Sequence, residues 1–309
     1  MNKLRTISQD NAFRLLCLLA AGIAGVLMLG FMVQLAVDSS AAWREFGLGF
    51  IFSSEWDPWS NRYGALPSIV GTLITTVIAL VVALPLAFAA ALFLTDAPPW
   101  LSQIIGNAID LLAAIPSVIY GMWGLFVLAP IMQDYVQPFL IDDLGLGRIP
   151  FVGEYYMGFG LFTAGLILAL MILPYMAAIM RDVFAMTPQV LREAAYGIGC
   201  TRWETAKDIV LKYGIRGLLG GVFIGLGRAL GETMAVLFVV GNIMDMPQTL
   251  SDGGTTIAST LANNFSEADG LQRSALMALG IILFAMSFLI QIISHYYLSA
   301  TKSKRGEAK

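Results

Sequence analysis

Long apolar stretches alternate with short polar segments along the chain. Six stretches are long enough to cross a bilayer, because its hydrocarbon layer needs about 20 apolar residues in a helix. They are residues 12–37, 67–94, 103–132, 158–180, 215–240 and 271–298. The pattern therefore predicts an all-α integral membrane protein with six transmembrane helices.

Prolines interrupt three of these stretches, at Pro85, Pro116 and Pro174. A proline inside a helix removes one backbone hydrogen bond and bends the axis. We therefore expect kinked helices there. Pro116 and Pro174 either shape a passage through the protein or are simply tolerated kinks.

The first apolar stretch raises the alternative of a cleaved signal peptide. It is far longer than the roughly 7–15 apolar residues of a signal peptide, so we expect a retained span. Residues 38–63 then mix aromatic and polar side chains, which is typical of a segment at a membrane interface. We divide the chain into 1–66 (first helix and interfacial segment), 67–300 (core of five transmembrane helices with a cytoplasmic loop at 182–214) and 301–309 (cytoplasmic tail).

Composition agrees with a membrane protein, since 58% of the 309 residues are hydrophobic and only 13% are charged. Cys17, Cys200 and the single histidine, His295, fit neither a disulfide framework nor a metal site. The sequence has no P-loop and no nucleophile elbow with a histidine partner. We expect no cofactor, no metal, no nucleic-acid partner and no catalysis by this chain alone.

Lysine and arginine residues gather on alternate connections between the spans. With the N-terminus inside, the cytoplasmic side receives Lys3, Arg5, Arg14, Arg181, Arg192, Arg202, Lys207, Lys212, Arg216, Lys302, Lys304, Arg305 and Lys309. The outer side receives only Arg44, Arg62, Arg148 and Arg273. Because cytoplasmic connections carry the excess of positive charge, we expect both termini and the 182–214 loop in the cytoplasm.

That loop carries start and stop signals for two short helices. Thr187 is a candidate N-cap with Pro188 at the first helical position, and Gly199 suits the left-handed residue that ends a helix. Thr201 and Glu204 then form a second start signal, a capping box. These signals predict a compact helical unit that is too short to cross a bilayer and must dock on something.

This helical unit resembles the EAA loop of bacterial ABC importer permeases. The matching residues are Glu193, Ala194, Ala195, Gly199, Ile209 and Leu211. The resemblance implies the MetI-like core of type I importer permeases and a loop that docks in a groove of a separate ATPase. It assigns ATPase coupling to Glu193, Ala194, Ala195, Gly199, Thr201 and Glu204. The family usually has proline at the position of Lys212, so we expect the second helix to continue without a break.

The fifth predicted span combines glycine rows with two charged residues. Its glycines recur every fourth residue at Gly217, Gly221 and Gly225, and again at Gly227 and Gly231. This spacing lets helix backbones approach closely in lipid. Arg228 and Glu232 are four residues apart, hence on one face of a helix. An isolated charge at bilayer depth costs about 2.5–3.5 kcal/mol, so we expect them to face each other, a partner subunit or a watery path.

The run from Gly227 to Val236 resembles the corresponding helix of phosphate-specific importer permeases, and residues 52–73 extend the resemblance. It implies a permease subunit of an ATP-driven phosphate import complex in the bacterial inner membrane. The implied partners are inorganic phosphate, a homologous second permease, an ATPase dimer and a periplasmic phosphate-binding protein that docks near 242–270. Residues 242–270 are polar, contain no lysine or arginine, and are expected to form a loop.

Within this resemblance, Arg228 is the candidate contact for the anion, because a guanidinium offers several donors to phosphate oxygens. Glu232 would orient Arg228 and offset its charge. The alternative is a structural ion pair. Asp110, near the start of its span, has no basic residue close in sequence, and its role is open.

Two other functions compete with phosphate import. An importer for another oxyanion, molybdate or sulfate, would share the EAA loop. A stand-alone anion channel or carrier would lack an associated ATPase. Recovery of an ATPase with the purified chain would therefore distinguish an importer from a channel or carrier.

Overall fold

The computed structural model describes residues 2–145, 147, 152–153 and 157–306. Arg148 and residues 307–309 of the expected tail lie outside this part of the chain. In the described part, six helical segments are long and apolar enough to cross a membrane, as the sequence predicts. They are Phe13–Asp38, Leu66–Asp96, Ser117–Asp143, Leu161–Ala185, Arg202–Leu230 and Gly270–Tyr297.

Helices α4 (Leu66–Asp96) and α8 (Leu161–Ala185) form the centre of the bundle. Small side chains line the buried face of α4 at every fourth position: Ala79, Ala83, Ala87 and Ala91. Because these methyl groups are short, the two helix axes approach closely. Pro85 and Pro174 lie inside α4 and α8, as expected.

Helix α11 (Leu211–Leu230) packs on α8 through the first glycine row. Side chains of α8 fill the space where each glycine lacks one: Val183 lies at Gly217, Ile179 at Gly221 and Met176 at Gly225. Gly227 has open space around its α-carbon instead. Only the first of the two predicted rows therefore forms a helix contact within the described part of the chain.

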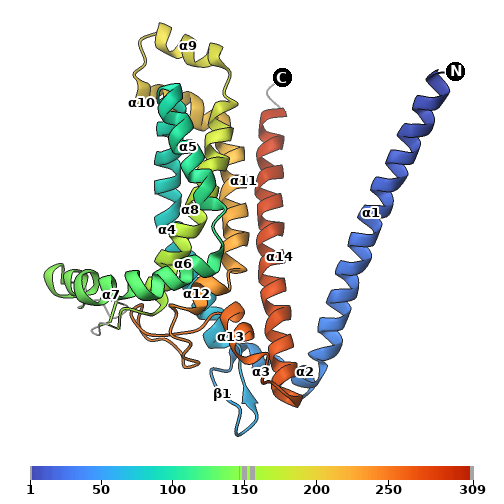
Figure 1. Cartoon of the computed structure of the whole chain (residues 1–309), viewed down its shortest axis with the longest axis vertical. Coiled ribbons are helices and arrows are strands. Elements are labelled where there is room, and N and C mark those ends of the chain that lie inside the picture. The colour runs from blue at the N-terminus through green and yellow to red at the C-terminus, as the bar shows by residue number, and fades with distance from the viewer. Residues whose placement is uncertain (1, 146, 148–151, 154–156, 307–309) are drawn as a thin grey trace.

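The expectation of one span over 103–132 with a kink at Pro116 is corrected, because a helix ends there instead of bending. Helix α5 (Pro99–Ala113) ends before Pro116, which is the N-cap of α6 (Ser117–Trp123). A proline disfavours the helical conformation of the residue before it, so the chain turns here. Helical segments η1 (Gly124–Leu128), α7 (Ala129–Ile131), η2 (Met132–Val136) and η3 (Phe139–Asp143) follow. In Figure 1, α5 runs along the bundle, whereas α6 and α7 lie across its lower end.

The two ends of the bundle carry different elements (Figure 1). Helix α9 (Gln189–Gly197) and helix α10 (Arg202–Glu204) lie at one end, together with both chain termini. The opposite end carries α2 (Ser40–Phe46), α3 (Gly49–Phe52), α12 (Met234–Leu237) and α13 (Ile257–Asn264). We call the first of these two ends the α9 end and the second the α13 end. Helix α1 (Asn2–Asp38) diverges from α14 (Gly270–Gly306) toward the α9 end.

Helix α13 corrects the expectation that 242–270 is entirely loop. Thr256 and Ser259 form a capping box at its start, with both reciprocal bonds present. A hydroxyl network then joins α13 to α4. Ser68 and Thr260 hydroxyls are 3.0 Å apart, and the Ile257 amide donates to the Thr72 hydroxyl at 2.9 Å. These buried bonds fix the register of α13 on α4.

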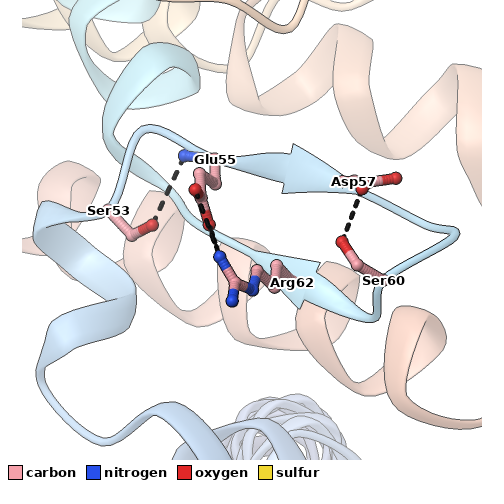
Figure 2. Close-up of polar contacts among 5 residues, drawn as sticks. All are labelled: Ser53, Glu55, Asp57, Ser60 and Arg62. Atoms are coloured by element: carbon pink, nitrogen blue, oxygen red, sulfur yellow. Dashed lines mark hydrogen bonds and ion pairs between the residues drawn. The ribbon is translucent and has the colours of Figure 1, made fainter.

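A two-stranded hairpin projects from the α13 end (Figure 1). Strand β1 (Trp56–Asp57) pairs antiparallel with β2 (Arg62–Tyr63). Figure 2 shows that Arg62 bridges to Glu55 across the base and that Ser60 donates to Asp57 in the turn. The Trp56 ring packs edge-on against buried Tyr63, which anchors the hairpin, while Trp59 at the tip is 96% exposed.

Candidate functional site

The α9–α10 segment is built by local backbone signals. The structure makes Pro188, and not Thr187, the N-cap of α9, without a side-chain cap bond. The Thr187 expectation is therefore wrong. Gly199 has φ +91°, as its predicted helix-ending role requires. The capping box is confirmed: the Glu204 amide donates to the Thr201 hydroxyl at 3.2 Å, and the Thr201 amide donates to Glu204 at 2.7 Å.

The predicted coupling residues lie on the outer surface of this segment. Glu193, Ala194, Gly199, Thr201 and Glu204 are exposed, whereas Ala195 is buried beneath them. Large apolar side chains share the surface: Val190, Leu191, Ile198 and Trp203. Ile198 is 83% exposed. Large apolar side chains exposed among polar residues are typical of surfaces that contact another protein.

Helix α10 continues into the membrane without a break. The η5 segment (Thr205–Val210) follows α10 directly and leads into α11. Lys212 donates to Asp208 one turn earlier at 2.7 Å, and no break occurs there, as its non-proline identity predicts. The chain from α10 to Arg228, in the last turn of α11, therefore forms one continuous helical path.

A groove of about 720 Å³ separates α9 from the ends of α4, α5 and α8. Its charged lining residues are Asp96, Arg181, Asp182, Arg192, Glu193 and Arg202. The Arg181 guanidinium is 3.8 Å from the carboxylate of Asp110 on α5. This contact gives Asp110 the basic partner that sequence spacing does not reveal, since 71 positions separate the two residues.

Arg228 and Glu232 do not share a helix face, which corrects the expectation for the fifth span. Helix α11 ends at Leu230, and Gly231 is its C-cap. The Glu232 carboxylate instead accepts from the Ala235 amide at 3.2 Å, at the start of α12. Within the described part of the chain, no ion pair joins the two residues.

The Arg228 side chain is exposed on the bundle surface and lies over the Tyr175 ring of α8, 5.6 Å from its centroid. An aromatic face attracts a cation without neutralising its charge. A second groove of about 520 Å³ borders the same helix end, between Gly231, Met234 and Phe265. The end of α11 thus presents an unneutralised guanidinium beside a break in the helix.

Six apolar helices with a capped helical segment at one end are the architecture of the membrane component of a transporter. Residues 83–303 match the family described as binding-protein-dependent transport system inner membrane component. The chain belongs to this family of ABC importer permeases.

The relatives of the chain match most of its length. It is 45% identical over 301 residues to the "Phosphate transport system permease protein PstC" of Haemophilus influenzae, covering 96% of each chain. It is 48% identical over 285 residues to the protein of the same name from Pasteurella multocida, covering 91% of this chain and 89% of the relative.

Solved structures show the same fold at low sequence identity. A chain of a bacterial alginate ABC transporter aligns with a TM-score of 0.59 and 16% identity, covering 90% of this chain and 93% of the other. A chain of the MetNI methionine ABC transporter aligns with a TM-score of 0.55 and 14% identity, covering 77% and 94%. The MetI-like fold expected from the EAA resemblance is confirmed.

Proposed function

We propose that this chain is the membrane-spanning permease subunit of an ATP-driven phosphate importer. The full-length similarity to relatives named phosphate transport system permease carries the proposal. The exposed Arg228 guanidinium supports it, because five N–H donors in a fixed fork suit an oxyanion. Similarity of this extent to importer permeases sets aside the stand-alone channel or carrier.

Four partners complete the proposed complex. A PstA-like second permease pairs with this chain in the inner membrane, and a PstB-like ATPase dimer docks on the α9–α10 surface. A PstS-like periplasmic binding protein delivers phosphate to the opposite, α13 end. This arrangement requires both termini and α9 in the cytoplasm, which agrees with the excess of lysine and arginine on that side.

Closure of the ATPase dimer moves the α9–α10 segment in this mechanism. The continuous helix from α10 to α11 carries that movement to Arg228, so the anion contact changes its environment when ATP binds. Glu232 lies just beyond the helix break and lines the same pathway. Its negative charge limits how tightly an anion is held near Arg228.

Uptake into proteoliposomes that contain the whole complex tests the proposal. We expect transport of radiolabelled phosphate, with sulfate and molybdate transported poorly. Arg228→Gln is expected to lower phosphate uptake roughly 100-fold, because it removes a charge-assisted contact worth about 1.5–3 kcal/mol and the attraction that draws the anion in.

Arg273→Gln is the matched control. Arg273 lies over the Phe265 ring at the same 5.6 Å distance but at the start of α14. Uptake that survives Arg228→Gln would make the Arg228–Tyr175 contact purely structural. If sulfate or molybdate is taken up faster than phosphate, that oxyanion is the substrate instead of phosphate.

A further inference from the structure

Arg192 joins three elements at the α9 end. Its side chain leaves α9, and one terminal nitrogen donates to the Phe184 carbonyl oxygen on α8 at 2.7 Å. The other terminal nitrogen is 3.8 Å from the Asp96 carboxylate at the last residue of α4. The Arg192 side chain is only 18% exposed, so this guanidinium is held between the helices.

Arg181 forms a second link, from α8 to α5. Its guanidinium lies against Gly106 of α5, where a side-chain carbon would be 2.8 Å from the arginine nitrogen, and it extends to Asp110 one turn further on. The absent side chain at Gly106 provides the space for this crossing. Together, Arg192 and Arg181 connect α9 with α4, α5 and α8.

These links are poorly suited to stabilising the fold. Both ion pairs are 3.8 Å long, and the two carboxylates are 42% and 54% exposed. Partly exposed ion pairs contribute little to the free energy of folding. An arginine that binds a backbone carbonyl and a carboxylate at once, however, fixes the relative positions of the elements that carry them.

We infer that Arg192 is the positioning residue that makes α9 move together with the ends of α4 and α8. The inference rests on the proposed function and deepens it. Movement of the docked ATPase reaches α11 through the continuous α10–η5 helix, and it reaches α4 and α8 through Arg192. Two connections from one docking surface, one to α11 and one to α4 and α8, then move these helices together.

Three substitutions separate positioning from docking. Arg192→Gln is expected to leave the ATPase bound and hydrolysing ATP while phosphate uptake falls roughly tenfold, a coupling change of the usual size. Asp96→Asn retains the carbonyl bond of Arg192 and is expected to cost less, roughly threefold. Lys212→Gln is the matched control, because it removes a positive charge whose ion pair with Asp208 lies within one continuous helix.

Two results would overturn the inference: uptake per ATP unchanged in Arg192→Gln, or loss of the ATPase from the purified variant. The first removes the positioning role and the second makes Arg192 a docking residue. Wild-type uptake of phosphate tests the proposed function separately.

A distance measurement tests the link whatever the substrate is. Spin labels at Val190 on α9 and Phe93 on α4, both exposed, report the separation of these elements after Cys17 and Cys200 are replaced by serine. We expect one narrow distance distribution with Arg192 and a broad one with Arg192→Gln. Equally narrow distributions would contradict the inference.

Discussion

The two ends of the bundle are held together by different chemistry. At the α13 end, buried hydroxyls of Ser68, Thr72, Thr255 and Thr260 bond one another and the backbone at 2.7–3.0 Å. At the α9 end, partly exposed ion pairs at 3.8 Å lie beside a groove of about 720 Å³. Short buried bonds tie α13 firmly to the bundle, whereas long, partly exposed ion pairs contribute little free energy, so the linked helix ends at the α9 end can shift together as one unit.

This difference suits a protein that is moved from one side. In the proposed complex, the α13 end acts as the fixed pivot and the ATPase acts on the α9 end. The pivot also receives the binding protein. The predictions below test whether the two ends differ in rigidity as their bonds indicate.

Adding one carbon at a buried glycine is expected to have the largest effect. A side-chain carbon at Gly71 of α4 would overlap the Thr255 carbonyl oxygen, and neither backbone has room to yield. We expect Gly71→Ala to lower the free energy of unfolding by about 3 kcal/mol, the upper part of the overpacking range. Thermal unfolding of the purified protein in detergent measures this.

Gly106→Ala is the matched change at the α9 end. There the added carbon meets the end of the flexible Arg181 side chain, which can move aside. We expect a cost below about 1 kcal/mol, because a helical Gly→Ala change itself gains about 0.5–1 kcal/mol. Equal losses in the free energy of unfolding for the two variants would show that the two ends do not differ in rigidity.

Removing one hydroxyl from the network is expected to have a smaller effect. The Thr72 hydroxyl accepts from the Ile257 amide and donates to the Ser68 carbonyl, so Thr72→Val leaves a buried amide without its partner. The expected loss is about 1–3 kcal/mol. Thr95→Val serves as the control, since Thr95 donates only to Ala91 within its own helix. A loss no greater than that of the control would show that the network does not hold α13.

The smallest effect is expected at the projecting hairpin. The Ser60 hydroxyl and the Trp59 amide donate to Asp57 and hold the pKa of this carboxyl below its ordinary value of 3.8. The folded turn therefore favours the ionised form. The contribution of the ionised Asp57 carboxylate to the stability of the turn is fully present above pH 3.8 and is lost as the pH falls through the lowered pKa.

Fluorescence of Trp59 follows this titration, because the ring lies at the exposed tip. We expect a local transition below pH 3.8 in the wild type and none in Asp57→Asn. Unfolding of the whole bundle in the same pH range would show that the hairpin is part of the pivot and not an appendage.

Apolar length and capping signals predicted most of the fold. The number of spans, the Thr201–Glu204 box, the glycine packing of α11 and the unbroken helix at Lys212 follow from local sequence. These features depend on residues within one or two helical turns. A kink was expected at Pro116, but the end of α5 was not, because the apolar run continues on both sides and hydropathy does not register a change of direction.

Contacts between distant segments were not predictable in this way. Asp110 meets Arg181, and Arg192 meets Asp96, only after α4, α5 and α8 pack together. The separation of Arg228 from Glu232 depends on where α11 ends. Gly231 is compatible both with a glycine row inside a helix and with the end of a helix, so the sequence does not show the end. The Thr256–Ser259 box has serine in place of the usual Glu or Gln, which hid the start of α13.

Purification of the tagged chain from native membranes in mild detergent tests the central claim most directly, namely that the α9–α10 surface holds an ATPase. We expect the ATPase and a second permease to be recovered with the wild type. Glu193→Lys or Gly199→Leu should release the ATPase, because one reverses an exposed charge and the other strains a φ of +91°. Trp59→Ala at the opposite end should retain it. Recovery of an ATPase that is unaffected by the Glu193 and Gly199 variants, or recovery of the chain alone, would contradict the claim.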